Sequence, residues 1–238
     1  MPNTQTSVPA FTSGQVLTAA QMTEVNTGIP VFATTTTRDA AFGGTGEKTL
    51  AEGQFAYIEA SNTTQYYDGA AWQTVGSGLT LIKTQTIGSA VSSVTVSDVF
   101  SATYDNYLIT INGGAGSGTG SFYLTLGATA TGYYFGANYA TYAGASGVFS
   151  GANTTRIEDC CYYSVNAINM QMVIKSPFLA DHTFFNWQVS GAVASSNNIN
   201  TNGGGYLAND TSYTAFTLTA SSGTVTGGTI RVYGYQNS

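Results

Sequence analysis

The stretch NYLITINGGAGSGTGSFYLTLG, residues 106–127, decides the fold class of this chain. Apolar Ile109 and Ile111 alternate with Thr110, and a glycine-rich run then leads into a second run of the same texture. Alternation with a period of two predicts strands that turn one face toward a core, and the glycine-rich run predicts the connection between them. In the second run the pattern leaves two inward sets open, Phe122 with Leu124 or Tyr123 with Thr125.

Nine strand-like runs follow one another from Leu79 onward: LTLIKTQTI, SSVTVSDVF, NYLITING, GSFYLTLG, RIEDCCYYSV, MQMVIKSPF, HTFFNWQVSGAV, YTAFTLTAS and TIRVYGYQ. Short alternating strands between Gly, Asn and Ser turns, with almost no helical periodicity, are typical of an antiparallel sandwich. We therefore expect an all-β fold with a jelly-roll-like β-sandwich over residues 79–238, preceded by a small β-hairpin module and an amino-terminal anchor.

Two segments interrupt this rhythm, residues 131–153 and 195–213, and both are rich in Tyr, Gly, Asn and Ser. We expect extended loops there. Tyrosine supplies large contact area at a low entropy cost, so recognition of a binding partner is one use, and loops that face solvent or a neighbouring subunit and bind no ligand are the alternative. The candidate recognition contacts are Tyr133, Tyr134, Tyr139, Tyr142 and Tyr206.

Upstream of the sandwich, residues 53–75 (GQFAYIEASNTTQYYDGAAWQTV) predict a β-hairpin with a turn at Ser61-Asn62 and a close at Asp68-Gly69. It belongs to a module of residues 31–78 that begins with a short strand and a loop. An isolated hairpin is only marginally stable and cannot bury so many aromatic side chains. We expect Phe55, Tyr57, Tyr66 and Trp72 to contact other copies of the chain in a homotrimer.

The leader, residues 1–30, predicts one short helix with Thr18 as its N-cap and Gly28 as its stop. A helix of about two turns is unstable alone in water and needs a surface on which to dock. We therefore expect the leader to dock either on its own domain or on another protein. The side chains expected to do so are Phe11, Val16, Leu17, Met22 and Val25.

Composition excludes several functions. Only 8% of the residues are charged and the net charge is −6, with six scattered Lys and Arg, so a nucleic acid partner is not expected. The sequence lacks the apolar run of a transmembrane helix and the pattern of a secretory signal. Cys160 and Cys161 are neighbours and would point to opposite sides of a strand, so we expect two free thiols in a reducing cytoplasm and no disulfide.

Catalytic motifs are weak throughout. The chain has a single histidine, His182, and the adjacent Asp181 is too close in sequence to orient it. The run GGTGEKT, residues 43–49, lacks the strand and the spacing of a phosphate loop. Glu158 and Asp159 are the only paired carboxylates, and zinc-ligand spacing is missing. Calcium held by Asp210 and loop carbonyls is the one metal alternative. We predict no enzymatic activity, no cofactor and no metal.

Both ends of the chain resemble structural proteins of tailed bacteriophages, particularly fibre and appendage proteins. The resemblance lies in VLTAAQ (residues 16–21), in a T-x-x-R-D stretch from Thr35 to Asp39 and in a Y-D-G-x-x-W stretch from Tyr67 to Trp72. At the other end, GGTIRVYGYQNS resembles the last strand of small jelly-roll domains in phage tail and head fibres. No repeated shaft is present, so the resemblance implies a short appendage.

The resemblance implies a non-enzymatic virion protein that is assembled in the host cytoplasm. The leader would bind a capsid, portal, neck or tail protein, the hairpin module would be a spacer or trimer collar, and the jelly roll would face outward, where it could meet a host surface glycan or protein. Two alternatives stay open. One is a capsid decoration or cement protein that stabilises the head, and the other is a receptor-binding tail protein.

Overall fold

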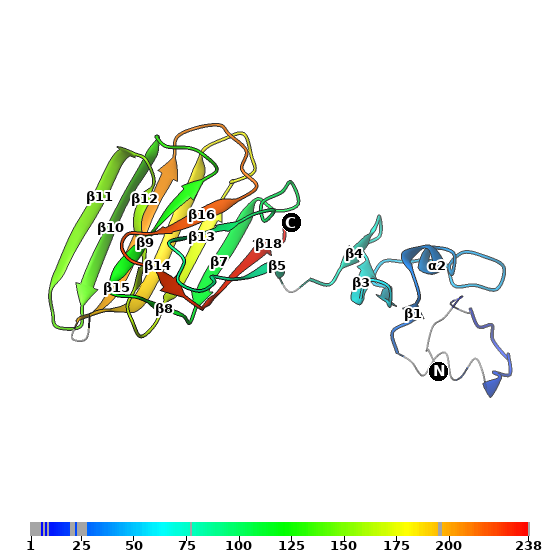
Figure 1. Ribbon diagram of the computed structural model, residues 1–238. Coiled ribbons are helices and arrows are strands. Elements are labelled where there is room, and N and C mark those ends of the chain that lie inside the picture. Colours follow the sequence, from blue (N-terminus) through cyan, green and yellow to red (C-terminus); the bar gives the residue numbers. More distant parts are fainter. Residues whose placement is uncertain are drawn as a thin grey trace. The chain divides into compact units, whose positions relative to one another are not determined.

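The chain forms two compact units, residues 1–77 and 78–238, which we call the amino-terminal unit and the sandwich unit. The computed structural model in Figure 1 describes residues 6, 8, 10–19, 22, 28–76, 78–194 and 197–237. None of the helical segments in these ranges has the length and apolar character that a bilayer crossing requires.

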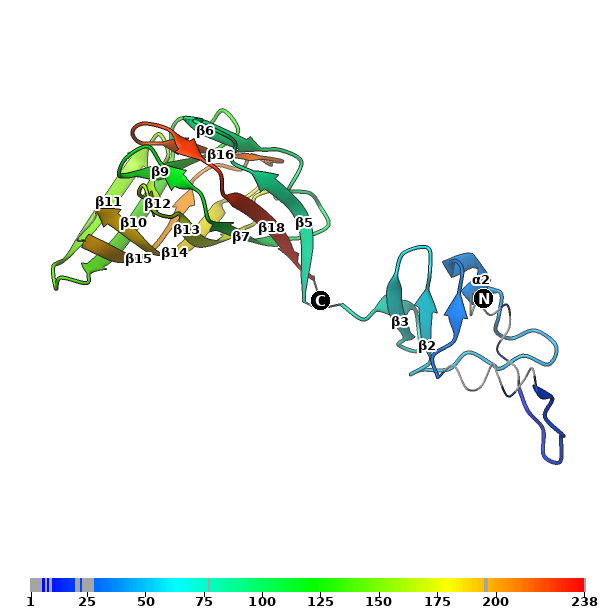
Figure 2. The same ribbon diagram turned by 60° about the horizontal axis from the view of Figure 1, so that its bottom comes forward.

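The sandwich unit consists of two main antiparallel sheets that face each other, as Figure 2 shows. In spatial order, the large sheet contains β11 (Ser146–Thr154), β10 (Tyr133–Thr141), β15 (Asn197–Leu207), β14 (Thr183–Ala194), β13 (Asn169–Lys175), β7 (Asn106–Asn112), β18 (Thr229–Tyr235) and β5 (Leu79–Thr86). The small sheet contains β12 (Ile157–Tyr163), β9 (Gly120–Leu126), β16 (Phe216–Ala220) and β6 (Ser93–Val96). The strands β8 (Ala115–Gly116) and β17 (Val225–Thr226) form a separate two-stranded antiparallel sheet.

Side-chain alternation builds one continuous core between the two sheets. Ile109 and Ile111 of β7 point inward with no exposed surface, while Thr110 lies on the opposite face. In β9 the inward set is Phe122 with Leu124. These residues share one hydrophobic cluster with side chains of both sheets. The predicted all-β fold with an antiparallel sandwich is therefore confirmed.

All nine predicted runs form strands, but the prediction of two long loops is wrong. Residues 133–154 form the hairpin of β10 and β11, and residues 197–207 form β15, which lies between β10 and β14. Inward glycines of β15 leave room for atoms of the neighbouring strands. A Cβ at Gly203 would lie 2.1 Å from the Trp187 ring, and a Cβ at Gly205 would lie 2.3 Å from the Tyr134 carbonyl oxygen.

The two cysteines lie in β12 and are both fully buried and free. Their expected placement on opposite sides of a regular strand is modified by a register shift between Ile157 and Cys161, where Asp159 adopts φ = 53°. The Cys160 Sγ–H donates to the Phe122 carbonyl oxygen at 3.2 Å, and the Cys161 Sγ–H donates to that of Asn169 at 3.6 Å. Burial raises the pKa of both thiols.

The amino-terminal unit contains a four-stranded sheet in the order β1 (Val31–Phe32), β2 (Phe55–Ile58), β3 (Thr63–Tyr67) and β4 (Trp72–Thr74). The predicted hairpin is confirmed as β2 and β3, with Asn62 in the left-handed turn conformation at φ = 53°. Two features were not foreseen. β4 adds a third antiparallel strand, and β1 pairs with β2 in parallel.

The short strand expected at the start of the 31–78 module is β1, but a short helix that was not expected, α2 (Thr35–Asp39), follows it. Thr34 caps it, since its hydroxyl accepts from the Thr37 N–H at 3.2 Å. The helix expected after Thr18 lies largely outside the described residues. Within them, the Met22 N–H donates to the Thr18 carbonyl oxygen at 3.0 Å, which is the spacing of an α-helix.

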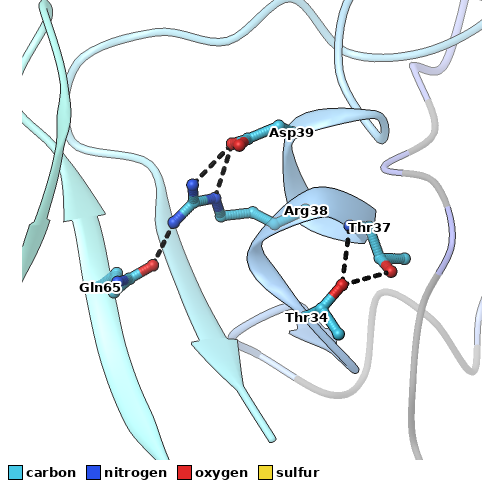
Figure 3. Close-up of polar contacts among 5 residues, drawn as sticks. All are labelled: Thr34, Thr37, Arg38, Asp39 and Gln65. Carbon is cyan, nitrogen blue, oxygen red and sulfur yellow. Dashed lines mark hydrogen bonds and ion pairs between the residues drawn. The ribbon is translucent and has the colours of Figure 1, made fainter. Parts of the chain in front are cut away.

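A buried arginine joins α2 to the sheet (Figure 3). Arg38 is 5% exposed, pairs with Asp39 at 2.7 Å and donates to the Gln65 side chain on β3. Its guanidinium carbon also lies 4.5 Å from the centroid of the Trp72 ring. The T-x-x-R-D and Y-D-G-x-x-W stretches therefore meet in one structural cluster, although they are far apart in the sequence.

Candidate functional site

The candidate site lies on the outer face of the large sheet, the face that points away from the core. Side chains two residues apart on a strand share a face, so each outward position on one strand lies beside an outward position on the next. This register places three rows of side chains across the strands β10, β15, β14 and β13. Each row has its own chemistry.

The first row consists of carboxamides. Cross-strand pairing connects Asn138 to Asn202, Asn202 to Gln188, and Gln188 to Gln171. We call these four residues the amide row. All four side chains are exposed. Four consecutive strands therefore present a line of groups that both donate and accept hydrogen bonds.

These amides are mostly unpaired within the chain. In the part that the structure describes, the one hydrogen bond made by the side chains of the amide row is from Asn202 Nδ2 to Asn200 Oδ1, at 3.3 Å. The neighbouring Asn186 side chain likewise has no hydrogen-bond partner among the described residues. Because these positions are open to solvent, the amides bond to water in the free protein and remain available to a ligand.

The second row is a floor with few side chains. Gly136 pairs with Gly204, and Gly204 pairs with Asn186. A Cβ built at Gly136 would have no heavy atom within 4 Å, so the space above it is open. The hollow over this floor has a volume of about 520 Å³ and is bordered by Asn138 and Asn202 of the amide row. The hollow is shallow and widely open to solvent, so a ligand would lie along it and would not be enclosed.

The third row is aromatic and runs along the other side of the floor. Tyr134 pairs with Tyr206, which pairs with Phe184, and we call these three residues the aromatic row. The rings of Tyr134 and Tyr206 stack with centroids 5.0 Å apart and planes at 8°. Phe184 is 46% exposed, with its ring centroid 6.2 Å from that of Tyr206. The ring of His182 lies 5.9 Å from Tyr206.

Charge is sparse around these rows. Among the described outward positions from β11 to β13, the single charged side chain is Lys175, which pairs with Phe184 at the end of the aromatic row. We name the outward strip between the amide row and the aromatic row, with its floor of Gly136, Gly204 and Asn186, the outer groove. The hollow in it borders the amide row and extends over Val148 and Ser150 of β11. Its chemistry suits hydrogen bonding and ring stacking to a neutral ligand.

The five tyrosines expected to contact a receptor are not equivalent. Tyr134 and Tyr206 belong to the aromatic row, while Tyr139 is half-buried on the other face of β10 and Tyr142 is exposed in the turn that follows. Tyr133 is different, because its side chain lies in the core with its hydroxyl accepting from the Leu126 N–H at 2.8 Å. Burial raises the pKa of Tyr133 to about 12. It presents no surface to a partner.

The aromatic residues expected at a trimer contact also divide into two kinds. Phe55 and Tyr66 are exposed and lie next to each other, with ring centroids 6.3 Å apart. Tyr57 is half-buried and donates to Asn62. Trp72 is half-buried against Phe42 of the same unit, at 5.9 Å between ring centroids. Trp72 therefore has a structural use inside one copy of the chain.

The leader residues are exposed as far as the structure describes them. The exposed fractions are 41% for Phe11, 89% for Val16, 37% for Leu17 and 48% for Met22. Val25 lies outside the described residues. Backbone hydrogen bonds hold the start of this segment, from the Val8 N–H to the Ala41 carbonyl at 3.1 Å and from the Lys48 N–H to the Val8 carbonyl at 2.7 Å.

The remaining candidates for chemistry stay apart from one another. The described residues contain no group of three or more His, Cys, Asp or Glu side chains that could hold a metal ion. His182 is exposed, and its backbone N–H donates to Asp181 at 2.7 Å. Glu158 pairs with Arg156 at 3.2 Å. In the 43–49 loop, the Gly44 N–H donates to Glu47 at 2.9 Å, so a side chain of the loop itself occupies that donor.

Comparison with known proteins gave no match, either to a family model, to a curated protein or to a solved structure. Sequence reasoning missed the amide row because its members come from four strands whose register is fixed only in the folded sheet. The available signal was the alternation of Gly and Asn with aromatic residues in 131–153 and 195–213, which was interpreted as loop composition.

Proposed function

We propose that this chain is a non-enzymatic structural protein of a tailed-phage particle, a short homotrimeric fibre or a head or tail appendage. Its amino-terminal unit would attach it to the particle, and its jelly-roll-like sandwich would face outward. The observation that carries the proposal is the exposed apolar leader, which a surface of another protein would cover. The resemblance of both chain ends to phage appendage proteins points in the same direction.

The leader is suited to attachment because it combines a fixed base with projecting apolar side chains. Hydrogen bonds at Val8 hold its start on the 41–48 loop, while Phe11, Val16 and Leu17 remain exposed beyond that point. Single exposed apolar side chains are common, but several within a short segment are typical of an interface. The same leader would serve a cement protein if it spread over neighbouring capsid subunits.

The test measures incorporation into particles. Particles assembled without the chain are supplied with wild-type protein or with a variant that combines Phe11→Ser, Val16→Ser and Leu17→Ser. We expect the purified particles to contain the wild-type chain and to lack the variant. Val148→Ser is the matched control, since Val148 is 83% exposed but belongs to the sandwich unit. Normal incorporation of the triple variant, or particles that never contain the wild-type chain, would contradict the proposal.

A homotrimer is the proposed assembly, with Phe55 and Tyr66 as its contact. The two exposed rings lie side by side on the hairpin, where copies related by a threefold axis could cover them. Light scattering of the wild-type chain should give a trimer mass, and Phe55→Ser with Tyr66→Ser should give a monomer. A monomeric wild-type chain would exclude self-assembly in the absence of the particle. If particles that lack the chain are less resistant to heat and salt than normal particles, the cement alternative would be favoured.

A further inference from the structure

We infer that the outer groove binds a neutral oligosaccharide that lies across the strands between the amide row and the aromatic row. The biological use of such binding, contact with a host surface, rests on the proposed function. The binding itself does not, because it needs only the sandwich unit.

The amide row matches the hydrogen-bonding pattern of sugar hydroxyls. Each hydroxyl can donate one hydrogen bond and accept others, and each carboxamide offers two N–H donors and one oxygen acceptor. Gln188 and Asn202 are opposite each other on adjacent strands, so neighbouring hydroxyls of one sugar ring can reach both. Strands lie about 4.8 Å apart, so the row repeats at the scale of sugar units along a chain.

The aromatic row supplies the other half of sugar recognition. One face of a pyranose ring presents weakly positive C–H groups, which pack on the negative face of an aromatic ring. Phe184 is the most exposed ring of the row, and the stacked pair Tyr134 and Tyr206 continues the apolar surface beside it. A sugar chain between the rows would therefore meet carboxamides on one edge and aromatic rings on the other.

The glycine floor gives the ligand its room. Gly136 has no positive φ and no close neighbour at its Cβ position, so neither the backbone conformation nor packing requires glycine there. The side chain that it lacks is the one that would fill the groove. The outer groove is therefore open above Gly136, next to Asn138 and Asn202.

Charge and polarity distinguish this ligand from other occupants. A polyanion would need several cations, whereas Lys175 is the single charge on the described outward positions from β11 to β13, and the chain carries a net charge of −6. A second copy packed sheet to sheet would need interdigitating apolar side chains. The amide row cannot supply them, so a neutral sugar chain fits this face better than a protein.

The test is a binding assay of the full chain on an array of neutral and acidic oligosaccharides, followed by titration calorimetry with the best neutral binder. We expect Gly136→Leu to abolish binding, because the new side chain would fill the groove. Gln188→Leu and Asn202→Leu should each weaken binding about tenfold, through the loss of one or two hydrogen bonds. Asn112→Leu, at an exposed outward position of β7, is the matched control and should bind as the wild type does.

Circular dichroism and the thermal midpoint show whether Gly136→Leu is folded, and Gln188→Leu provides a second route if it is not. Binding that survives both variants would overturn the inference. So would binding to acidic sugars alone, absence of any bound neutral sugar, or self-association that Gly136→Leu removes. None of these results depends on particle incorporation, so failure of the groove and failure of the attachment proposal are separate outcomes.

Discussion

The two units of this chain are stabilised in different ways. In the sandwich unit, one apolar cluster draws residues from both main sheets, and the turns and strands enclose it. In the amino-terminal unit, the fully apolar core consists of Phe32, Ala41, Ala56 and Ile58, and a charged residue, Arg38, is buried beside it. The comparison shows that a small unit depends on individual polar contacts where a large one depends on apolar area.

Size explains the difference. A unit of about 160 residues can bury some 70% of the surface of its unfolded chain, while a unit below about 80 residues has little apolar core to stabilise it. The amino-terminal unit adds an N-cap, an ion pair with stacking on Trp72, and a turn closed by Asp68. We therefore expect the stability of the sandwich unit to be most sensitive to loss of buried apolar surface, and that of the amino-terminal unit to loss of single polar contacts.

The largest effect is expected in the sandwich core. Phe216 of β16 is fully buried, with its ring centroid 5.9 Å from that of Phe100. Phe216→Ala should lower the free energy of unfolding of the sandwich unit by about 3–5 kcal/mol, because it removes buried apolar surface and leaves a cavity. Urea unfolding measures the change. Hydrogen exchange in the same samples should show unchanged protection of the amino-terminal unit, and a loss in both units would show that they are coupled.

The next effect concerns the buried arginine. Arg38→Ala should destabilise the amino-terminal unit by about 2 kcal/mol, because it removes charged hydrogen bonds to Asp39 and Gln65 and the stacking on Trp72. Arg38→Lys keeps the charge but loses the planar guanidinium group, so its stability should lie between that of the wild type and that of Arg38→Ala. Trp72 fluorescence in a Trp187→Phe background follows this unit alone. An effect of Arg38→Ala below that of a surface substitution would refute the role we assign to the cluster.

A smaller effect is expected at the N-cap of α2. Thr34→Ala removes the acceptor of the Thr37 N–H and should lower the stability of the amino-terminal unit by about 1 kcal/mol. Thr36→Ala is the matched control, because it replaces an exposed threonine inside the same helix and should be neutral or slightly stabilising. The same fluorescence signal measures both variants. Equal losses in the two would mean that the cap contributes nothing specific.

The smallest effect is a pH dependence at the turn after β3. The Asp68 carboxylate accepts from the N–H groups of Ala71 and Ala70 and from Gln73, and these bonds lower its pKa. Its stabilising contribution is therefore present above the unfolded pKa of about 3.9 and is lost as the pH falls through the lower pKa of the folded state. Asp68→Asn should flatten this part of the acid titration of the amino-terminal unit. The sandwich unit should be unaffected.

Sequence reasoning recovered the strands whose alternation uses large apolar residues. In β7, Ile109 and Ile111 point inward on either side of Thr110, and in β16, Phe216 and Leu218 point inward on either side of Thr217. A period of two is therefore visible in the sequence. In β10 and β15 the same period is hidden, because Gly and Ala occupy positions on both faces. Gly203 is required there by the Trp187 ring of the neighbouring strand, and that contact depends on long-range register.

The candidate site was less accessible to prediction than the fold. Tyr134 and Tyr206 are two of the five tyrosines predicted to contact a receptor, and both belong to the aromatic row, where their contact with a receptor remains a prediction. Tyr133 could not be separated from Tyr134 while the segment was interpreted as a loop, since only a strand sends neighbours to opposite faces. The amides of β13 and β14 carried no local signal, because an outward Gln on a strand is ordinary surface composition.

The position of β18 has a consequence for synthesis on the ribosome. β5 is the first strand of the sandwich unit to emerge, yet its partner in the large sheet is β18, which follows the other strands in sequence. Until Thr229–Tyr235 leave the exit tunnel, β5 and β7 both present unpaired edges that other nascent chains could join. Products that end before β18 would keep the β7 edge exposed and leave β5 without its partner, and exposure of strand edges favours aggregation, chaperone binding and proteolysis.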